Sequence, residues 1–195
     1  MGPFTNQTNL ILASASPRRQ ELLSLLGIHF FVQPSKLPEP SPDPKISPQE
    51  YALNLSRQKA FDVANQFPQD AILGADTIVV LEDKILGKPK DKKQALDYLL
   101  LLAGQTHTVI TGVTLIVNEQ AYSFAVHTKV SLANFPLEVL KKYADSSEPL
   151  DKAGAYAIQG KGSFLIKSIS GSYTNVIGLP LTETTALLLE KKIIA

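Results

Sequence analysis

The chain has 195 residues, of which 44% are hydrophobic and 19% are charged, a balance typical of a globular protein with a substantial core. Its formal net charge of +1 gives no overall electrostatic attraction toward DNA, RNA or an anionic membrane. It contains no cysteine, which excludes disulfides and zinc sites built on thiolates.

The three histidines, His29, His107 and His127, lack the spacing of metal ligands. A bound metal would therefore be a hard divalent ion, such as Mg2+ or Mn2+, held by carboxylate and phosphate oxygens. The sequence shows neither a signal peptide nor an apolar run of bilayer length. We expect one cytoplasmic domain over residues 1–195, with a flexible N-terminus over residues 1–8.

The first half of the chain alternates between strands and helices. Prolines at positions 34, 38, 40, 42, 44 and 48 exclude both a helix and a central strand in the loop between residues 33 and 48. Composition alone favours a linker here, whereas the strong elements on both sides look like parts of one domain. The expected elements are a strand over residues 9–13, a helix from Pro17 to about Leu26, a strand over residues 29–33, a helix from Pro48 to about Asn65 with Ser47 and Glu50 as a capping box, and a strand hairpin over residues 71–86.

The second half of the chain is richer in β-structure. Two β-rich runs, over residues 105–117 and 121–133, are joined at residues 118–120 as a hairpin. Because hairpins interrupt the alternation of strands and helices, we expect an α/β protein with a mixed sheet. The chain has no internal repeat. It also contains neither of the two glycine-rich phosphate-binding motifs, GxxxxGK(S/T) and GxGxxG. The other expected elements are a helix capped by Asp91 and ending at Leu102, a helix over residues 136–144, a strand over residues 162–170 and a helix over residues 180–192.

Two arginines stand where the first helix is expected to begin, in the stretch SASPRR. Ser16 can cap this helix, so Arg18 and Arg19 lie at its electropositive end. A cation there costs about 0.3–1 kcal/mol, unless the arginines and the helix N–H groups hold an anion. The arginines alone slightly favour a solvated pair, while the small residues 13–15, Ser14 among them, favour a phosphate site.

Other candidate residues are ambiguous when taken singly. Asp76 interrupts an apolar strand. Its carboxylate could be functional, or it could be hydrogen-bonded to nearby backbone, and the sequence supports the two alternatives about equally. Lys59 and Lys88 fall in suggestive places, and Glu39 is the only glutamate of the proline-rich loop, but each alone is most often a solvated charge. Gln159 has a donor and an acceptor, which suits the reading of a base edge, although its glycine-rich segment is also typical of an ordinary loop.

Six motifs occur in one order along the chain: SASPRRQELL, GADTIVV, GKP, LAGQTHTVITGV, EPLDKAGAYAIQGKG and GSYTNVIGLPL. In this order they resemble the Maf family of nucleoside triphosphate pyrophosphatases over residues 10–188. The resemblance implies an elongated mixed sheet with flanking helices and two lobes around a central cleft, as in inosine triphosphate pyrophosphatases. It also implies a homodimer that uses Mg2+ or Mn2+ to hydrolyse a nucleoside triphosphate to the monophosphate and pyrophosphate. The motif EPLDKAGAYAIQG looks like the branch that acts on dTTP, UTP and modified pyrimidine nucleotides, not on 7-methyl-GTP.

The resemblance also implies roles for individual residues. Asp76 is expected to accept a proton from water and, with Glu39, to hold the metal. Arg18 is expected to face the substrate and contribute to its choice, while Arg19 holds phosphate. The remaining residues expected at the site are the catalytic lysines Lys59 and Lys88 and the substrate-binding residues Ser14, Thr77 and Gln159.

Two other functions stay open at this point. The family is associated with cell-division arrest, so a regulatory protein that acts through partner binding is one alternative. A single-stranded nucleic-acid binder is the other, but the near-zero net charge and the absence of tryptophan count against it. We expect a nucleoside triphosphate as the partner, with no nucleic acid and no membrane. A metal-dependent assay of pyrophosphate release distinguishes the enzyme from the regulatory protein.

Overall fold

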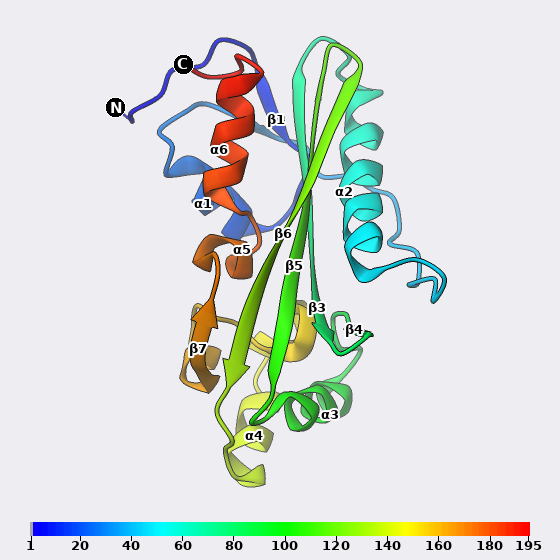
Figure 1. Cartoon of the computed structure of the whole chain (residues 1–195), viewed down its shortest axis with the longest axis vertical. Coiled ribbons are helices and arrows are strands. Elements are labelled where there is room, and N and C mark those ends of the chain that lie inside the picture. The colour runs from blue at the N-terminus through cyan, green and yellow to red at the C-terminus, as the bar shows by residue number, and fades with distance from the viewer. Residues whose placement is uncertain (1) are drawn as a thin grey trace. The chain divides into compact units, whose positions relative to one another are not determined.

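The computed structural model describes residues 2–195 (Figure 1). Its strands are β1 (Leu10–Leu12), β2 (Phe31–Val32), β3 (Ala71–Leu81), β4 (Lys84–Leu86), β5 (Thr106–Val117), β6 (Gln120–Leu132) and β7 (Ile166–Ser170). Within the described residues they form a seven-stranded sheet of order β2-β1-β3-β5-β6-β7, and β4 pairs with β3. β1 is parallel to both β2 and β3, whereas β4 is antiparallel to β3 and β7 to β6. The predicted α/β fold with a mixed sheet is therefore confirmed.

All the helices that the sequence predicts are present, with ends that shift by a few residues. They are α1 (Pro17–Ser24), α2 (Pro48–Ala64), α3 (Lys92–Leu102), α4 (Leu137–Ala144) and α6 (Leu181–Glu190). The sequence does not predict α5 (Tyr173–Ile177) or the short 3-10 helices η1 (Glu148–Asp151), η2 (Ala153–Ala155) and η3 (Lys161–Leu165). Among residues 2–195, no helix has both the length and the apolar composition that crossing a membrane requires.

The predicted strand over residues 162–170 is wrong in its first part. η3 occupies that part, and only β7 is extended. The Glu148 carboxylate accepts the N–H groups of Lys161 and Gly162 at 2.9 and 2.8 Å. These bonds satisfy the first N–H groups of η3, which favours a helical turn over a strand.

The chain forms two compact units, in agreement with the two expected lobes. The first unit contains the residues up to Asp76 together with Thr111–Val126 and Gly178–Ala195, and the second contains Thr77–Ile110 and His127–Ile177. β3, β5 and β6 contribute residues to both units. The core of the first unit includes Ile11, Val63, Ile72 and Ile116, and that of the second includes Leu86, Leu99, Leu102, Leu140 and Leu165.

In the first unit, α2 lies directly against the backbone of β3 and β5 because two strand positions lack a side chain. A Cβ added to Gly74 would lie 2.5 Å from the carbonyl oxygen of Ser56 and 2.9 Å from Cβ of Ala60. A Cβ added to Gly112 would lie 2.5 Å from the carbonyl oxygen of Ala52. These two glycines therefore set how closely α2 rests on the sheet, and Figure 1 shows the helix alongside the strands.

Two of the predicted helix caps are confirmed. The Ser47 hydroxyl accepts the N–H of Glu50 at 3.2 Å, and the Asp91 carboxylate accepts the N–H of Gln94 at 2.8 Å. The Glu50 carboxylate, however, pairs with Arg57 at 2.8 Å, so its expected return contact in the capping box gives way to an ion pair along α2. Both caps satisfy N–H groups that would otherwise have no partner within the helix.

Residues 5–7, which the sequence assigns to a flexible N-terminus, are hydrogen-bonded to the last residues of the chain. Thr5 and Ala195 exchange two backbone hydrogen bonds of 2.8 and 2.9 Å. Asn6 forms an isolated antiparallel bridge with Ile194. These bonds attach the start of the first unit to its end.

Candidate functional site

Ser14 and Arg19 fix the first turn of α1 in the first unit. The Ser14 hydroxyl accepts the N–H of Ser16 at 3.3 Å and NH1 of Arg19 at 3.1 Å. Nε of Arg19 donates to the carbonyl oxygen of Gly178 at 2.7 Å. Ser16 stands at the N-cap position, but within the described residues its side chain makes no capping hydrogen bond. The predicted side-chain cap is therefore wrong, and Ser14 binds the Ser16 N–H instead.

Arg18 and Arg19 are both half-buried at the start of α1. Burial lowers the pKa of Arg19, although the negative charges of Asp76 and Glu39 oppose this effect. Within the described helix, no acidic side chain lies in the first turn. Two cations therefore stand at the electropositive end of the helix, where a bound anion is favoured.

Asp76 lies on β3 and is only 6% exposed. Because side chains alternate along a strand, it faces the same side of the sheet as Gly74, two residues before it. That is the side on which α2 packs, and Nζ of Lys59 on α2 donates a hydrogen bond to the Asp76 carboxylate. The close packing at Gly74 thus brings a lysine 17 residues away in sequence into contact with Asp76.

Lys59 also binds the proline-rich loop. Its Nζ donates to Oε1 of Glu39 at 2.7 Å. The side chains of Lys59 and Asp76 are 16% and 9% exposed, whereas that of Glu39 is 47% exposed, so the ammonium joins a buried carboxylate to one at the surface. The loop is therefore part of the first unit, and the alternative of a linker between domains is wrong.

The pKa of Asp76 lies above the ordinary range of an aspartate. Burial raises it, and the negative charge of Glu39 adds to this rise. The positive charges of Lys59 and Arg19, together with the hydrogen bond from Lys59, oppose the rise without cancelling it. A carboxylate with a raised pKa accepts a proton more readily near neutral pH than an exposed aspartate does, which suits a general base.

The first unit offers two carboxylates to a divalent metal. Asp76 and Glu39 both accept from the Lys59 ammonium, so their oxygens converge on one position that attracts a cation. Across residues 2–195, no group of three or more histidine, cysteine, aspartate and glutamate side chains is arranged to hold a metal. Mg2+ is commonly bound by one or two carboxylates together with substrate phosphates and water, so this donor set fits an ion that binds with a triphosphate.

Thr77, Lys88 and Gln159 lie in the second unit. Thr77 is half-buried on β3, and Lys88 is exposed in the turn after β4. The carbonyl oxygen of Gly87 accepts the N–H of Gly154 at 3.1 Å. This bond attaches the turn that carries Lys88 to the segment that leads to Gln159, so two predicted residues lie on joined segments of the second unit.

Glu148 fixes the loop that carries Gln159. Its carboxylate accepts hydrogen bonds from the N–H groups of Lys161 and Gly162 and, at 2.8 Å, from the hydroxyl of Tyr143. Burial alone would raise the pKa of Glu148, but these three donors hold it below its ordinary value. The carboxylate is therefore ionised at neutral pH and closes the loop across Gln159, which is itself exposed.

A buried pair of rings, His107 and Tyr156, anchors the same loop on the other side of Gln159, and the sequence does not predict it. Nε2 of His107 lies 2.7 Å from the Tyr156 hydroxyl, and the two rings meet edge to face with centroids 5.3 Å apart. His107 is 2% exposed, and burial lowers its pKa to about 4. In the sequence, His107 is a lone histidine within a predicted strand. Its spacing from other residues does not indicate which residue it pairs with.

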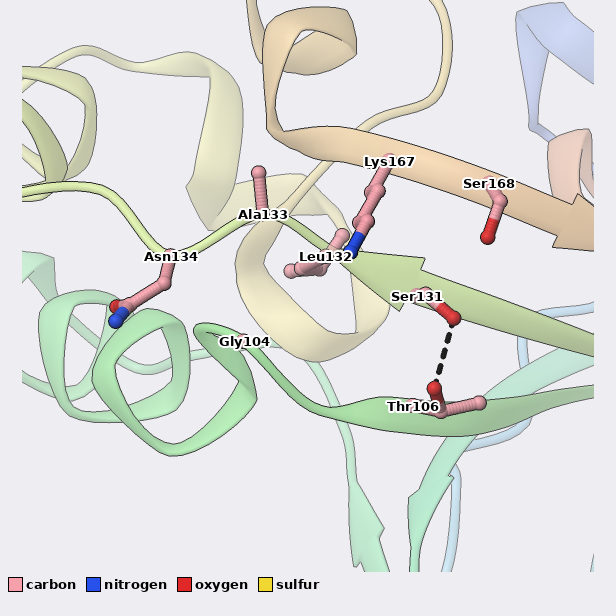
Figure 2. Close-up of a pocket in the computed structure, with 8 residues that line it drawn as sticks. All are labelled: Gly104, Thr106, Ser131, Leu132, Ala133, Asn134, Lys167 and Ser168. Carbon is pink, nitrogen blue, oxygen red and sulfur yellow. Dashed lines mark hydrogen bonds between the residues drawn. The ribbon is translucent and has the colours of Figure 1, made fainter.

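The second unit also contains a polar pocket of about 430 Å³ (Figure 2). Residues near the ends of β5 and β6 line it together with residues of β7, and the hydroxyls of Thr106 and Ser131 are joined by a hydrogen bond of 2.7 Å. Lys167 supplies a cation to its wall. The residues that line this pocket are distinct from all those predicted for the site.

The chain is similar to known proteins along most of its length. Residues 9–191 match the family described as Maf-like protein. A dTTP/UTP pyrophosphatase from Bacillus pumilus is 45% identical over 179 residues, which cover 92% of this chain and 94% of the relative. A dTTP/UTP pyrophosphatase from Myxococcus xanthus is 47% identical over 183 residues, which cover 94% and 92%. Among solved structures, the Ham1 protein of Staphylococcus aureus matches with a TM-score of 0.52 and 14% identity, covering 94% of this chain and 100% of that one, which shows a shared fold alone.

Proposed function

The chain belongs to the Maf-like protein family, and from this premise we propose that it hydrolyses dTTP and UTP to the monophosphate and pyrophosphate. One observation of the structure carries the proposal. The buried carboxylate of Asp76 is bound by Lys59 and lies in the electrostatic field of Arg19. A base and cations for phosphate oxygens therefore occur together in the first unit, in a chain whose relatives carry that enzyme name.

Asp76 is the proposed general base. The oxygen of a water molecule attacks the α-phosphorus, a new oxygen–phosphorus bond forms, and the bond from the α-phosphorus to the bridging oxygen breaks. Asp76 takes the proton that the water loses, and pyrophosphate leaves with the electron pair of the broken bond. The raised pKa of Asp76 supports this role, because a base whose pKa is closer to neutral pH takes up a proton more readily.

Four cations are proposed to act on the substrate. Arg19 is held by Ser14 and by a backbone carbonyl, so its charge is in place before the substrate binds and little reorganisation is needed. Arg18, in the same turn of α1, faces the substrate, while Arg19 holds phosphate. Lys59 and Lys88 add positive charge that stabilises the pyrophosphate leaving group.

Asp76 and Glu39 are the proposed ligands of Mg2+ or Mn2+. When bound, such an ion neutralises phosphate charge and orients the attacking water. Both carboxylates lie within reach of one ammonium, so they stand close enough to share an ion, which would take the place that the Lys59 ammonium occupies in this structure.

Arg18, Thr77 and Gln159 are the proposed determinants of substrate choice. The side-chain amide of Gln159 offers one acceptor and two donors, which can pair with the N–H and the carbonyl groups of a uracil or thymine ring. Its loop is fixed on one side by Glu148 and on the other by the pair of His107 and Tyr156. This anchoring supports a role in reading a base, because a fixed loop presents its amide to fewer positions than a mobile loop does.

We further propose that the enzyme works in the cytoplasm as a homodimer, without nucleic-acid or membrane partners. The support is the family resemblance and the net charge of +1, which gives no general attraction for polyanions. Sedimentation equilibrium of the purified chain tests the dimer, and cell fractionation tests the location.

Pyrophosphate release tests the proposed reaction. The purified chain is incubated with dTTP, UTP, a 5-modified UTP, GTP or 7-methyl-GTP, each with Mg2+ or Mn2+. We expect monophosphate and pyrophosphate in equal amounts, higher kcat/KM for dTTP and UTP than for the purine nucleotides, and loss of activity with a chelator. Release of single phosphate groups contradicts the proposal. Absence of release from every nucleotide also contradicts it and favours the regulatory protein.

A further inference from the structure

Glu39 lies between two prolines whose carbonyl oxygens are both bound by side chains of α2. Pro38 accepts a hydrogen bond of 3.2 Å from Nε2 of Gln58, and Pro40 accepts one of 2.8 Å from the hydroxyl of Tyr51. Proline has no N–H, so the carbonyl is the only backbone hydrogen-bonding group that either proline offers. Each of these carbonyls has a partner on α2, and Glu39 is thereby held from both sides.

Tyr51, Gln58 and Asp62 form a stripe along one face of α2, which we name the α2 stripe. Their separations of seven and four residues place them on the same face of the helix. The Asp62 carboxylate accepts the N–H of Lys36 at 3.0 Å. The loop over residues 36–40 therefore runs antiparallel to α2 and is bound to it at every second residue.

The backbone of this loop has little freedom of its own. The proline rings fix φ at Pro38 and Pro40, and a residue that precedes a proline is confined to extended conformations, which applies to Leu37 and Glu39. A stiff segment loses less conformational entropy when it is held, so a few hydrogen bonds suffice to fix it. Between two bound prolines, Glu39 extends its side chain to Lys59.

We propose that the α2 stripe positions Glu39 for the reaction, by holding its loop where the carboxylate meets the lysine that also binds Asp76. The kinetic part of this inference rests on the proposed function, whereas its structural part, a loop fixed on α2, is independent of it. Burial and the negative charges of Asp76 and Glu39 raise the pKa of Tyr51, which keeps the hydroxyl protonated as a donor. The hydrogen bonds of the stripe reach backbone atoms of the loop on both sides of Glu39, so we assign its members as positioning residues.

Limited proteolysis measures whether the α2 stripe holds the loop. The peptide bonds after Lys36 and Lys45 are trypsin sites in the exposed loop. The test variants are Tyr51→Phe, which keeps the ring, and Gln58→Leu, which keeps most of the aliphatic volume. Losing one hydrogen bond of ordinary strength raises the population of the open loop, so we expect cleavage at these bonds to be about 2- to 10-fold faster in each variant.

Two control variants remove comparable hydrogen bonds elsewhere. Tyr122→Phe removes a hydroxyl that is bound to the exposed side chain of Gln120. Thr185→Val removes a hydroxyl that donates at 2.7 Å to a backbone carbonyl of its own helix, α6. We expect both controls to be cleaved in the loop at the wild-type rate. Equal cleavage rates in the test variants and the controls overturn the inference.

A double-mutant cycle with Glu39→Gln tests whether the stripe acts through Glu39. In the wild-type background, Tyr51→Phe is expected to lower kcat/KM for dTTP about 2- to 10-fold and to raise the Mg2+ concentration at half-maximal rate. In the Glu39→Gln background, the same change is expected to have no further effect on either quantity. An equal loss in both backgrounds overturns the inference, because it shows an effect that bypasses Glu39. If the wild type releases no pyrophosphate, the proposed function fails, and proteolysis still decides whether the stripe holds the loop.

Discussion

Replacing Asp76 with asparagine removes a charge and a proton acceptor while keeping the size of the side chain. The amide oxygen can still accept a hydrogen bond from Lys59, and Gly74 still permits the close packing of α2, so the fold is expected to persist. General-base catalysis contributes about 100- to 10,000-fold to a rate. We therefore expect kcat for pyrophosphate release from dTTP to fall by that factor, measured at saturating dTTP and Mg2+.

The same substitution is expected to preserve or raise stability, and the sign follows from the pKa of Asp76. Burial raises this pKa, so the folded state binds the proton more tightly than the unfolded state does. Between the ordinary pKa of an aspartate and the raised value, stability falls as pH rises, and the ionised carboxylate is destabilising at neutral pH. Asparagine removes this contribution. Urea unfolding of both proteins at pH 7 and pH 5 measures the difference.

The matched control is Asp97→Asn, which changes an exposed aspartate of α3 in the same way. It is expected to change neither kcat nor the free energy of unfolding by a measurable amount. Near-normal pyrophosphate release by Asp76→Asn refutes the role of Asp76 as a base. Lower stability of Asp76→Asn at neutral pH refutes the electrostatic reasoning, because it shows that the attraction of Lys59 and Arg19 outweighs the cost of burial.

Three further predictions test the packing and the loops. Gly74→Ala adds a Cβ that would lie 2.5 Å from the Ser56 carbonyl oxygen, so it should displace α2 and lower the free energy of unfolding by about 1–3 kcal/mol, with a lower Tm. In the control Gly87→Ala, the added Cβ meets nothing within 4 Å, so the Tm should be unchanged. Glu148→Gln removes a charged acceptor from three donors, so it should loosen the loop that carries Gln159 and lower the dTTP-to-GTP ratio of kcat/KM. The control Glu138→Gln, on the exposed face of α4, should leave this ratio unchanged. An unchanged ratio in both variants contradicts the role of the loop. His107 has its pKa lowered from 6.5 to about 4 by burial, so the unfolded state binds more protons between these values and stability is lost as pH falls through them, by roughly 3 kcal/mol in full. His107→Gln should lack this part of the pH dependence in urea unfolding at pH 7 and pH 4.5, and equal changes in the two proteins contradict the reasoning.

The main elements were predictable because their signals are local. Ser47 and Asp91 mark helix starts through hydrogen bonds to residues three positions away. The hairpin between β5 and β6 turns at Asn118 and Glu119, which have φ values of 49° and 63°, as a two-residue turn of this kind requires. η3 was not predictable, because the carboxylate that caps it belongs to Glu148, 13 residues earlier in sequence.

The sequence marks the candidate residues by their type and place, whereas it does not report the contacts between them. A carboxylate in an apolar strand marked Asp76 as a buried charge, but its partner Lys59 lies on α2 and reaches it only because Gly74 lets the helix approach. Similarly, Arg19 was marked by its place at a helix start, while its contact with Gly178 joins positions 159 residues apart. Contacts between residues that are far apart in the sequence depend on how the elements pack, and the local spacing of residues does not predict that packing.

Burial disfavours the charged form of both Arg19 and Asp76, so it lowers the pKa of Arg19 and raises that of Asp76. The charge of each residue opposes the pKa shift of the other. A surface pair would avoid this cost, but water would then weaken the attraction of the arginine for phosphate and leave the carboxylate a poor base. The desolvation that destabilises the ionised pair is therefore what suits it to phosphoryl chemistry. Gly74 lets α2 approach β3 closely enough for Lys59 to reach Asp76, so a residue with no side chain takes part in building the proposed site.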